Sequence, residues 1–469
     1  MSAPLQPLFS LIKQGMPKRS MGIKLIVVCS LALLMTIPSF FVDSLIDDRT
    51  HRAAAVATEI GGLVGGPENF LGPTLAVPYH DMDAQGKPEN GLYLVAPATG
   101  DVVVTTTTQE RHRSLFKVPV YQADITFHAA FDLSGIPHGS GAVLDWDRAT
   151  IVVGAADARG ALADATLTSG GGSVKTFIPA TSLGTVTVPD TGVPESSAVR
   201  DNKDLKFFEV PVTGLAKADA KFDVTAKMKF SGAQRLVVEA YGKTTTVAMN
   251  GDWRNPSFDG YFLPVKRSMP GNGFEASWAV PFIARGVPAE GDTNMLANLG
   301  HTAMAVSFVE MVDPYQSVTR ALKYSPLFIF LIFLSYFLFE VTTGKRVHPA
   351  QYVLIGIAQT IFFVLLLSIA ERIGFDFAFI LSAIATVGLI SIYAKWTFDS
   401  RAQGLRALAI FSLLYGLIYI LLRLEDQALL VGSIASFVAI AAAMYFTRSM
   451  NWYGEQAPPP APTGPPPAV

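Results

Sequence analysis

The stretch "SPLFIFLIFLSYFLFEVTTGKRVHPAQYVLIGIAQTIFFVLLLSIA", residues 325–370, decides the fold class of this chain. It contains two apolar runs, Ser325 to Thr343 and Pro349 to Ala370, each of about 20 residues. A helix of that length crosses the hydrocarbon core of a bilayer with every backbone hydrogen bond satisfied internally. The stretch therefore predicts a membrane protein with closely spaced spanning helices.

The composition of the whole chain agrees with that prediction. Half of the 469 residues are hydrophobic and only 16% are charged, which is unusual for a soluble protein of this length. The single cysteine, Cys29, excludes a disulfide framework. The formal net charge of −2 gives no broad basic face, so nucleic acid is not an expected partner.

Apolar runs of similar composition occur at four more places. The first, Leu25 to Val42, follows basic residues and precedes Asp43. A cleaved signal peptide is the alternative, but the length and the lack of a small-x-small site favour an uncleaved anchor. The other runs are Phe377 to Ala394, Ala407 to Leu422 and Ala428 to Phe446. The sequence thus predicts six transmembrane helices.

The basic residues between these runs predict their orientation. Alternate links carry most of the Lys and Arg, namely Lys345, Arg346, Lys395, Arg401, Arg406 and, after the last run, Arg448. Because Lys and Arg accumulate on the cytoplasmic side, both termini are predicted to be cytoplasmic. The long region between the first two runs then lies outside.

The sequence pattern of this external region, residues 43–324, changes from helical to strand-like along its length. Residues 47–64 have helical composition and are expected to extend the first membrane helix as a stalk. Later segments such as "GLYLVAPATGDVVVTTTT" (91–108) and "KFDVTAKMKF" (221–230) alternate and are rich in β-branched residues. They predict a β-rich domain of antiparallel sheets, most simply a sandwich.

The predicted organisation therefore has five parts. They are a cytoplasmic leader (1–24), the first transmembrane helix (25–42), the external β-rich domain (43–324), a five-helix transmembrane bundle (325–446) and a cytoplasmic Pro-rich tail (447–469).

Charged residues at the predicted outer ends of the spans have two interpretations. Glu371, Arg372, Arg423 and Glu425 could be turn residues whose charges reach water. Alternatively they could form an ion-paired functional cluster just inside the outer surface, because ionisable groups at membrane depth are costly. Glu340, near the inner end of its span, is expected to pair with Lys345 and Arg346 or to reach water.

Enzyme signatures are sparse. Ser114 and Lys117 match S-x-x-K, but the flanking residues alternate like a strand, which puts the two side chains on opposite faces. His80, Asp81 and Asp83 lack the ligand spacing of a calcium loop and are expected at a hairpin tip. No enzyme activity, cofactor or metal is predicted.

Several longer segments resemble the CreD family of bacterial inner-membrane proteins. They include "GDWRNPSFDGYFLPVKRSMPGNGFEASW" (251–278), "VDPYQSVTRALKYSPLFIFLIFLSYFLFE" (312–340) and "LEDQALLVGS" (424–433). The resemblance implies a Gram-negative inner-membrane protein with a periplasmic domain, associated with cell-envelope integrity and stress response. It supplies no catalytic residues. Candidate partner-contact residues within its first segment are Trp253, Pro256, Phe258, Phe262 and Pro264.

Two functions follow from these observations. The first is non-enzymatic: the periplasmic domain binds or scaffolds an envelope component, a protein or glycan, while the helices contact membrane lipids. The alternative is a transporter or lipid-handling protein that uses Glu371, Arg372, Arg423 and Glu425 at the outer ends of the bundle.

Overall fold

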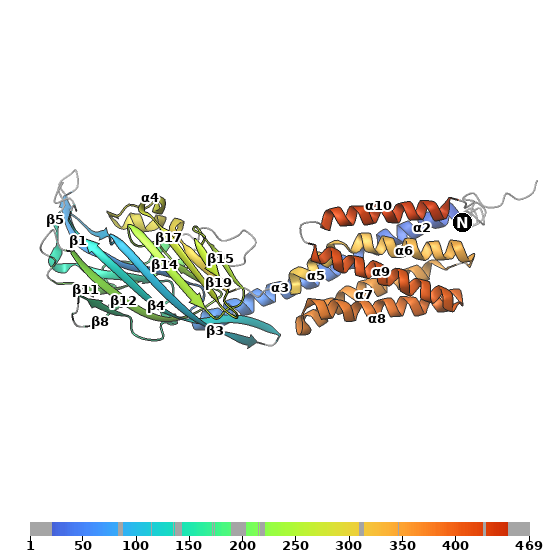
Figure 1. The fold of residues 1–469 in the computed structure, drawn as a ribbon, viewed down its shortest axis with the longest axis horizontal. Helices are drawn as coiled ribbons and strands as arrows, with labels where there is room; N and C mark the ends of the chain where they lie inside the picture. Colours follow the sequence, from blue (N-terminus) through green and yellow to red (C-terminus); the bar gives the residue numbers. More distant parts are fainter. Residues whose placement is uncertain are drawn as a thin grey trace, which may run out of the picture. The chain divides into compact units, whose positions relative to one another are not determined.

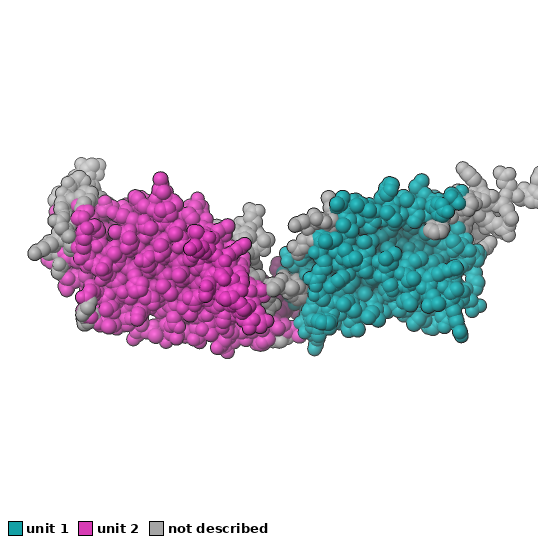
Figure 2. All heavy atoms as spheres, in the orientation of Figure 1, with its two compact units in different colours: residues 1–50, 312–469 teal, residues 51–311 magenta. Residues whose placement is uncertain are grey.

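The computed structural model describes residues 21–82, 88–113, 115–134, 136, 143–170, 172, 174–188, 203–213, 215, 221–308, 314–345, 347–424 and 428–448. The chain divides into two compact units (Figure 2). Residues 1–50 and 312–469 form the helical unit, and residues 51–311 form the β unit.

The helical unit is built from long apolar helices (Figure 1). Within the described ranges, five helical segments are long and apolar enough to cross a membrane. They are Gly22–Val64, which comprises α2 (Met21–Leu34) and α3 (Ile37–Val64), then α6 (Ser325–Thr343), α7 (Pro349–Ile373), α8 (Phe375–Phe398) and α9 (Arg401–Arg423). Helix α10 (Ala428–Thr447) holds a shorter apolar stretch, Leu430–Tyr445. Several apolar helices are thus confirmed, and the sixth span stays a prediction.

Aromatic side chains fill the interior of this unit. The ring of Phe362 on α7 contacts Phe379 of α8 and Tyr415 of α9, with centroids 5.5 and 5.0 Å away. The turn that follows α2 packs closely on α7 at Gly356, where a Cβ atom would lie 2.5 Å from the Met35 side chain. The amphipathic helix α5 (Pro314–Lys323) contacts the same bundle through α6, α7, α8 and α9.

Helix α3 continues into the β unit, which confirms the predicted helix over residues 47–64. It ends where Gly65 and Gly66 adopt positive φ angles of 108° and 74°. Ser231 donates a hydrogen bond to the Val64 carbonyl (2.8 Å), and the Ala233 amide donates to the Gly66 carbonyl (2.7 Å). The end of the helix is therefore fixed to the β unit.

Two sheets make up the β unit (Figure 1). Among the described residues, one has 11 strands with the path β10-β11-β6-β1-β13-β19-β15, joined by β2, β5, β9 and β18, and the other has eight in the order β16-β17-β14-β3-β4-β12-β7-β8. The strand bounds are β1 Glu68–Met82, β2 Pro88–Val95, β3 Thr99–Arg113, β4 Phe116–Asp132, β5 Val143–Leu144, β6 Thr150–Ala155, β7 Thr166–Ser169, β8 Lys175–Thr176, β9 Ile178–Pro179, β10 Val186–Val188, β11 Lys203–Pro211, β12 Lys221–Ala233, β13 Arg235–Val238, β14 Thr244–Gly251, β15 Pro256–Gly260, β16 Lys266–Ser268, β17 Phe274–Val280, β18 Glu290–Gly291 and β19 Met304–Phe308. Between them lie the one-turn helix α4 (Phe282–Arg285) and the 3₁₀ helices Trp146–Arg148, Ala158–Gly160 and Thr293–Thr302.

The prediction of antiparallel sheets is wrong for two strand pairs. Strand β1 runs parallel to β13, and β14 runs parallel to β3, so both sheets are mixed. Alternation of apolar residues reports which faces of a strand are buried and carries no information on strand direction. The parallel pairs join strands far apart in the sequence, which local patterns cannot predict.

The two sheets share one apolar core. Phe70 on β1 and Phe230 on β12 belong to different sheets, and their rings meet edge to face with centroids 5.2 Å apart. The buried Tyr241 hydroxyl donates to the carbonyl of His128 (2.7 Å). Alternate residues of β3, from Val102 to Thr106, are buried in this core, as the sequence pattern predicts.

The two weak sequence motifs lie at hairpins. Strands β3 and β4 pair through Arg113 and Phe116, with Lys117 on β4, and Ser114 lies outside the described residues. His80 on β1 contacts Asn90 on β2 (2.6 Å), and Asp83 lies outside the described residues. The strand predicted for the segment after Ser114 from its alternation is confirmed, and His80 and Asp81 lie at the paired ends of β1 and β2.

Candidate functional site

The segment 251–278 links the edges of the two sheets. It runs from the end of β14 through β15, the edge of the 11-stranded sheet, to β16 at the edge of the eight-stranded sheet. Gly260 stands at the crossing with φ of 98°, and a Cβ atom there would lie 2.6 Å from the Ala303 carbonyl oxygen. Only glycine fits this position without strain.

A buried ion pair holds β15 in place. Arg235 Nε on β13 donates to Asp259 Oδ1 (2.7 Å), and both side chains are largely buried. The hydroxyl of Ser307 on β19 donates to the other carboxylate oxygen. Three strands are therefore joined at one carboxylate, which stabilises the edge of the sheet.

The candidate contact residues of this segment mainly face the core. Trp253 meets Phe308 edge to face (6.4 Å), and Phe258 packs in the same way on Phe274 and Trp278 (both 6.0 Å). The half-buried Phe262 also packs against the core. Pro256 begins β15, and Pro264 is half-buried. A role in partner contact stays a prediction for these five residues.

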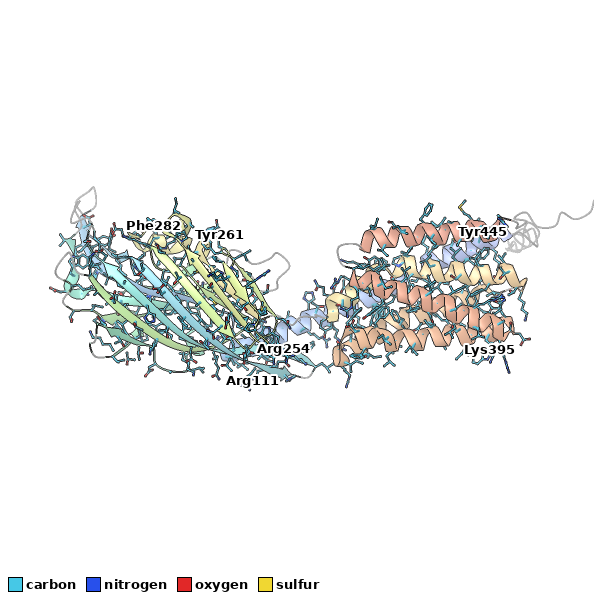
Figure 3. The ribbon with its side chains drawn as sticks, viewed as in Figure 1. Arg111, Arg254, Tyr261, Phe282, Lys395 and Tyr445 are labelled. Carbon is cyan, nitrogen blue, oxygen red and sulfur yellow. The ribbon has the colours of Figure 1, made fainter. Side chains whose placement is uncertain are left out.

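The outward-facing residues of the segment were missed by sequence analysis. Tyr261, Leu263 and Val265 alternate with Phe262 and Pro264 and are exposed, Leu263 by 68% and Val265 by 69%. The Val265 amide donates to the Ser277 carbonyl on β17 (2.8 Å). Helix α4, which follows β17, exposes Phe282 and 93% of Ile283. We name Tyr261, Leu263, Val265, Phe282 and Ile283 the apolar face (Figure 3). The period-two alternation of "YFLPV" is the signal that could have found its first half.

A buried arginine anchors α4. Arg285 Nε donates to the Ala240 carbonyl (2.9 Å) and Nη1 donates to the Pro288 carbonyl (2.9 Å). Burial lowers the pKa of the Arg285 guanidinium to about 10. The turn is therefore held against the β unit with its apolar side chains outward.

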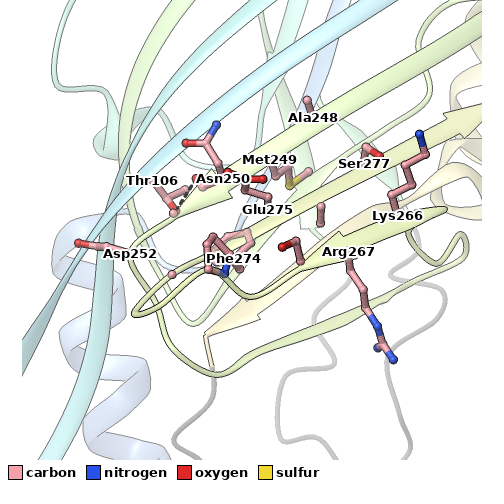
Figure 4. Close-up of a pocket in the computed structure, with 15 residues that line it drawn as sticks. Thr106, Ala248, Met249, Asn250, Asp252, Lys266, Arg267, Phe274, Glu275 and Ser277 are labelled. Atoms are coloured by element: carbon pink, nitrogen blue, oxygen red, sulfur yellow. Dashed lines mark hydrogen bonds between the residues drawn. The ribbon is translucent and has the colours of Figure 1, made fainter.

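An open depression of about 790 Å³ lies on the eight-stranded sheet beside this segment (Figure 4). Residues of β14, β16 and β17 line it, among them Asn250, Lys266, Arg267, Glu275 and Ser277. These side chains offer charged and amide groups for a polar ligand. Among the residues that the structure describes, no three His, Cys, Asp or Glu side chains come together to hold a metal.

At the ends of α7 and α9, Glu371 and Arg423 contact different partners. Glu371 accepts a hydrogen bond from Tyr315 (3.1 Å) and lies 3.8 Å from Arg49 Nε. Arg423 forms an ion pair with Asp376 and lies over the ring of Tyr419. Arg372 is exposed, and Glu425 lies outside the described residues. A functional role for the four candidates stays a prediction.

The expected pairing of Glu340 with Lys345 and Arg346 is wrong for Lys345. The buried Glu340 carboxylate instead pairs with Lys24 of α2, and it also accepts hydrogen bonds from Tyr352 (3.1 Å) and the Val347 amide (3.0 Å). Lys345 donates to the Phe398 carbonyl (2.5 Å), and Arg346 lies outside the described residues. Sequence patterns could not predict the pair of Lys24 and Glu340, because α2 and α6 are far apart in the chain and meet only in the folded bundle.

Buried polar side chains also occur deeper inside the bundle. Gln359 on α7 and Ser382 on α8 are fully buried, and their side chains have no hydrogen-bond partner among the described residues. Gln359 lies one turn from Phe362 and Ser382 one turn from Phe379, and these two rings are in contact. Polar groups in such surroundings are costly and commonly mark a functional position.

Together, the fold and these sites define a multi-pass helical membrane protein with a β-rich domain between its first apolar helices and the rest. The sequence model of a family described as Inner membrane protein CreD matches residues 20–453. The chain belongs to this CreD family. A relative from Escherichia coli (strain K12), described as Inner membrane protein CreD, is 27% identical over 437 residues, which cover 91% of this chain and 92% of the relative.

Proposed function

We propose that the chain is a non-enzymatic protein of cell-envelope integrity and stress response, whose β unit binds or scaffolds an envelope protein or glycan in the periplasm. In this proposal six helices cross the inner membrane, both termini are cytoplasmic and the two sheets form a sandwich. Family membership and the basic residues of alternate links support it.

The observation that carries the proposal is the depression beside segment 251–278. Arg267 and Ser268 lie on β16, which pairs with β17 at the edge of the eight-stranded sheet, so strand pairing holds them at the depression. A rigid surface with cationic and amide groups suits recognition of a polar envelope component.

Photo-crosslinking of the full chain in cells tests this proposal. A photoreactive amino acid replaces Ser268 in the depression or, as a control, the exposed Val174 elsewhere on the β unit. We expect a reproducible crosslinked envelope component at position 268 that Arg267→Glu diminishes. Equal crosslinking from both positions, or none from position 268, would contradict a binding role for the depression.

The alternative is a transporter or lipid-handling protein. It is favoured by Gln359 and Ser382 inside the bundle, whose side chains find no hydrogen-bond partner in the part of the chain that the structure describes, and by the Glu371 and Arg423 ion pairs at the helix ends. Under this alternative, Glu371→Gln and Glu425→Gln abolish the envelope phenotype while expression persists. A normal phenotype in both variants would contradict the transporter or lipid-handling alternative.

A further inference from the structure

Three polar side chains are buried inside the bundle of α7, α8 and α9. Gln359 on α7 and Ser382 on α8 are fully buried, and Tyr415 on α9 is exposed by only 2%. The side chains of Gln359 and Ser382 have no hydrogen-bond partner among the residues that the structure describes. Gln359 lies near the middle of α7, so neither end of this helix brings it to water.

Helix geometry places Gln359 and Ser382 at one level of the bundle. Helices α7 and α8 are joined by the single residue Gly374 and pack side by side (Figure 1), so they run antiparallel. The rings of Phe362 and Phe379 meet across this contact, with centroids 5.5 Å apart. Gln359 precedes Phe362 by three residues. Ser382 follows Phe379 by three, and in antiparallel helices both steps lead away from Gly374 by about 4.5 Å.

The hydroxyl of Tyr415 extends toward the same level. The Tyr415 ring contacts Phe362, with centroids 5.0 Å apart. Helical side chains lean toward the N-terminus of their helix, and α9 begins after α8 has run to the end of the bundle away from Gly374. The hydroxyl therefore extends past the Phe362 ring in the direction of Gln359, and the buried side chain of Thr386 lies near it.

The chemistry of this group suits an uncharged ligand. Gln359 supplies a carbonyl acceptor and an amide donor, and the two hydroxyls supply both functions. The acidic residues of α7, α8 and α9, which the structure describes throughout, are Glu371 and Asp376. Glu371 accepts a hydrogen bond from Tyr315, and Asp376 pairs with Arg423. Neither is free to compensate a bound cation, whose transfer out of water is costly.

A buried water molecule meets these requirements. Water both donates and accepts, and an internal water makes about three hydrogen bonds to polar groups that would otherwise be unsatisfied. The rings of Phe362 and Phe379 next to Gln359 and Ser382 cannot replace those bonds. Without a ligand, the amide and the hydroxyl would carry the full cost of removal from water.

Further polar positions lead from this group toward the turn between α8 and α9. Thr386 and Ser391 are buried on α8, and Gln403 is buried at the start of α9. At Gly404 a Cβ atom would lie 3.3 Å from the Ser391 carbonyl oxygen, so the two helices approach closely there. In the described part of the chain, the Ser391 hydroxyl and the Gln403 amide oxygen find no hydrogen-bond partner. Polar side chains therefore continue from mid-bundle to the helix ends.

We propose that Gln359, Ser382 and Tyr415 form a water-binding site inside the helical unit. Water reaches this site from the turn between α8 and α9, along the polar positions of these two helices. It gives the apolar bundle a hydrogen-bonding position at mid-length, which a polar solute can take over. The site requires neither binding at the depression of the β unit nor the charges at the outer helix ends, so its tests are separate from those of both proposed functions.

Solid-state NMR of the full chain in lipid bilayers tests the site directly. Glutamine and phenylalanine are labelled with ¹⁵N, and magnetisation is transferred from water to the protein. We expect the Gln359 side-chain amide to receive it faster than the backbone amide of Phe363, a buried apolar position one turn along α7. The variants Gln359→Asn and Phe363→Leu identify the two signals. Equally slow transfer to both groups would overturn the proposal.

Unfolding in detergent supplies a second measurement. Gln359→Met removes the amide that holds the water and leaves Ser382 without a partner, so we expect the folding equilibrium constant to fall by about tenfold. Ser382→Ala should cost about as much in the unmodified chain and little in the Gln359→Met background, because the shared water is already lost there. Leu366→Met is the matched control: it puts the same side chain at a buried apolar position two turns away and should have little effect.

Two results of this measurement would overturn the proposal. A folding constant that rises in Gln359→Met would show that the amide is buried without water. Additive effects of Gln359→Met and Ser382→Ala would show that the two side chains share none. If Gln359→Met does not fold, the NMR comparison decides alone.

Discussion

At the scale of single residues, two positions of segment 251–278 fix how this segment crosses between the sheets of the β unit. Gly260 permits the crossing between the sheets, and Asp259 joins three strands. Both residues lie within the range that the CreD family model matches. Their structural roles arise because β13, β15 and β19 come together only after folding.

We expect Gly260→Ala to lower the free energy of unfolding of the β unit by about 3 kcal/mol, because left-handed strain adds to a clash with the Ala303 carbonyl. Gly286→Ala is the matched control: its φ is 69°, but its Cβ atom meets open space, so strain alone costs roughly 1–2 kcal/mol. Thermal unfolding of the full chain in detergent measures both. Equal losses would show that the close approach at Gly260 does not matter.

The alkaline stability of the β unit should depend on Tyr121. Burial, followed by the nearby charge of Glu68, raises the pKa of Tyr121 well above its ordinary value. The unfolded chain then loses this proton first, so the stabilisation is complete below about pH 10 and declines as the pH rises further. We expect Tyr121→Phe to flatten the decline of Tm above pH 10, whereas Tyr261→Phe, at an exposed position, should not. An unchanged pH profile for Tyr121→Phe would contradict this account.

At the scale of elements, helix ends and close contacts decide how the segments dock. Gly65 and Gly66 end α3 at the sheet, and Gly356 lets the turn after α2 approach α7. The helices themselves follow from apolar composition and length, so sequence predicted them well. Which helix contacts which depends on side chains far apart in the chain, and sequence patterns carry no such information.

The Lys24 and Glu340 pair should attach α2 to the bundle. Lys24→Met leaves the buried Glu340 carboxylate without its cation, which we expect to destabilise the helical unit by about 3–5 kcal/mol. The double variant with Glu340→Gln should recover most of this loss, because no buried charge remains. Detergent-induced unfolding measures the stability of the helical unit in the single and the double variant. If both variants are equally unstable, the charge on Glu340 is not what Lys24 compensates.

At the scale of the whole molecule, the predicted topology can be tested directly. Reporter fusions after residues 323 and 424 should be periplasmic, and fusions after residues 400 and 453 should be cytoplasmic, because Lys and Arg accumulate on the inner side. The pair at 424 and 453 tests whether α10 crosses the membrane. A periplasmic reporter after residue 453 would reduce the number of spans to five.

The sequence by itself determined the membrane class, the positions of the apolar helices, the helix over residues 47–64 and the β-rich character of the region that follows it. Those features depend on composition and local periodicity, which each segment carries alone. Only the tertiary structure decided the parallel strand pairs, the partner of Glu340, the pairing of Arg423 with Asp376 and the outward direction of Tyr261, Leu263 and Val265. Each of these depends on contacts between distant segments, and such contacts exist only once the chain has packed.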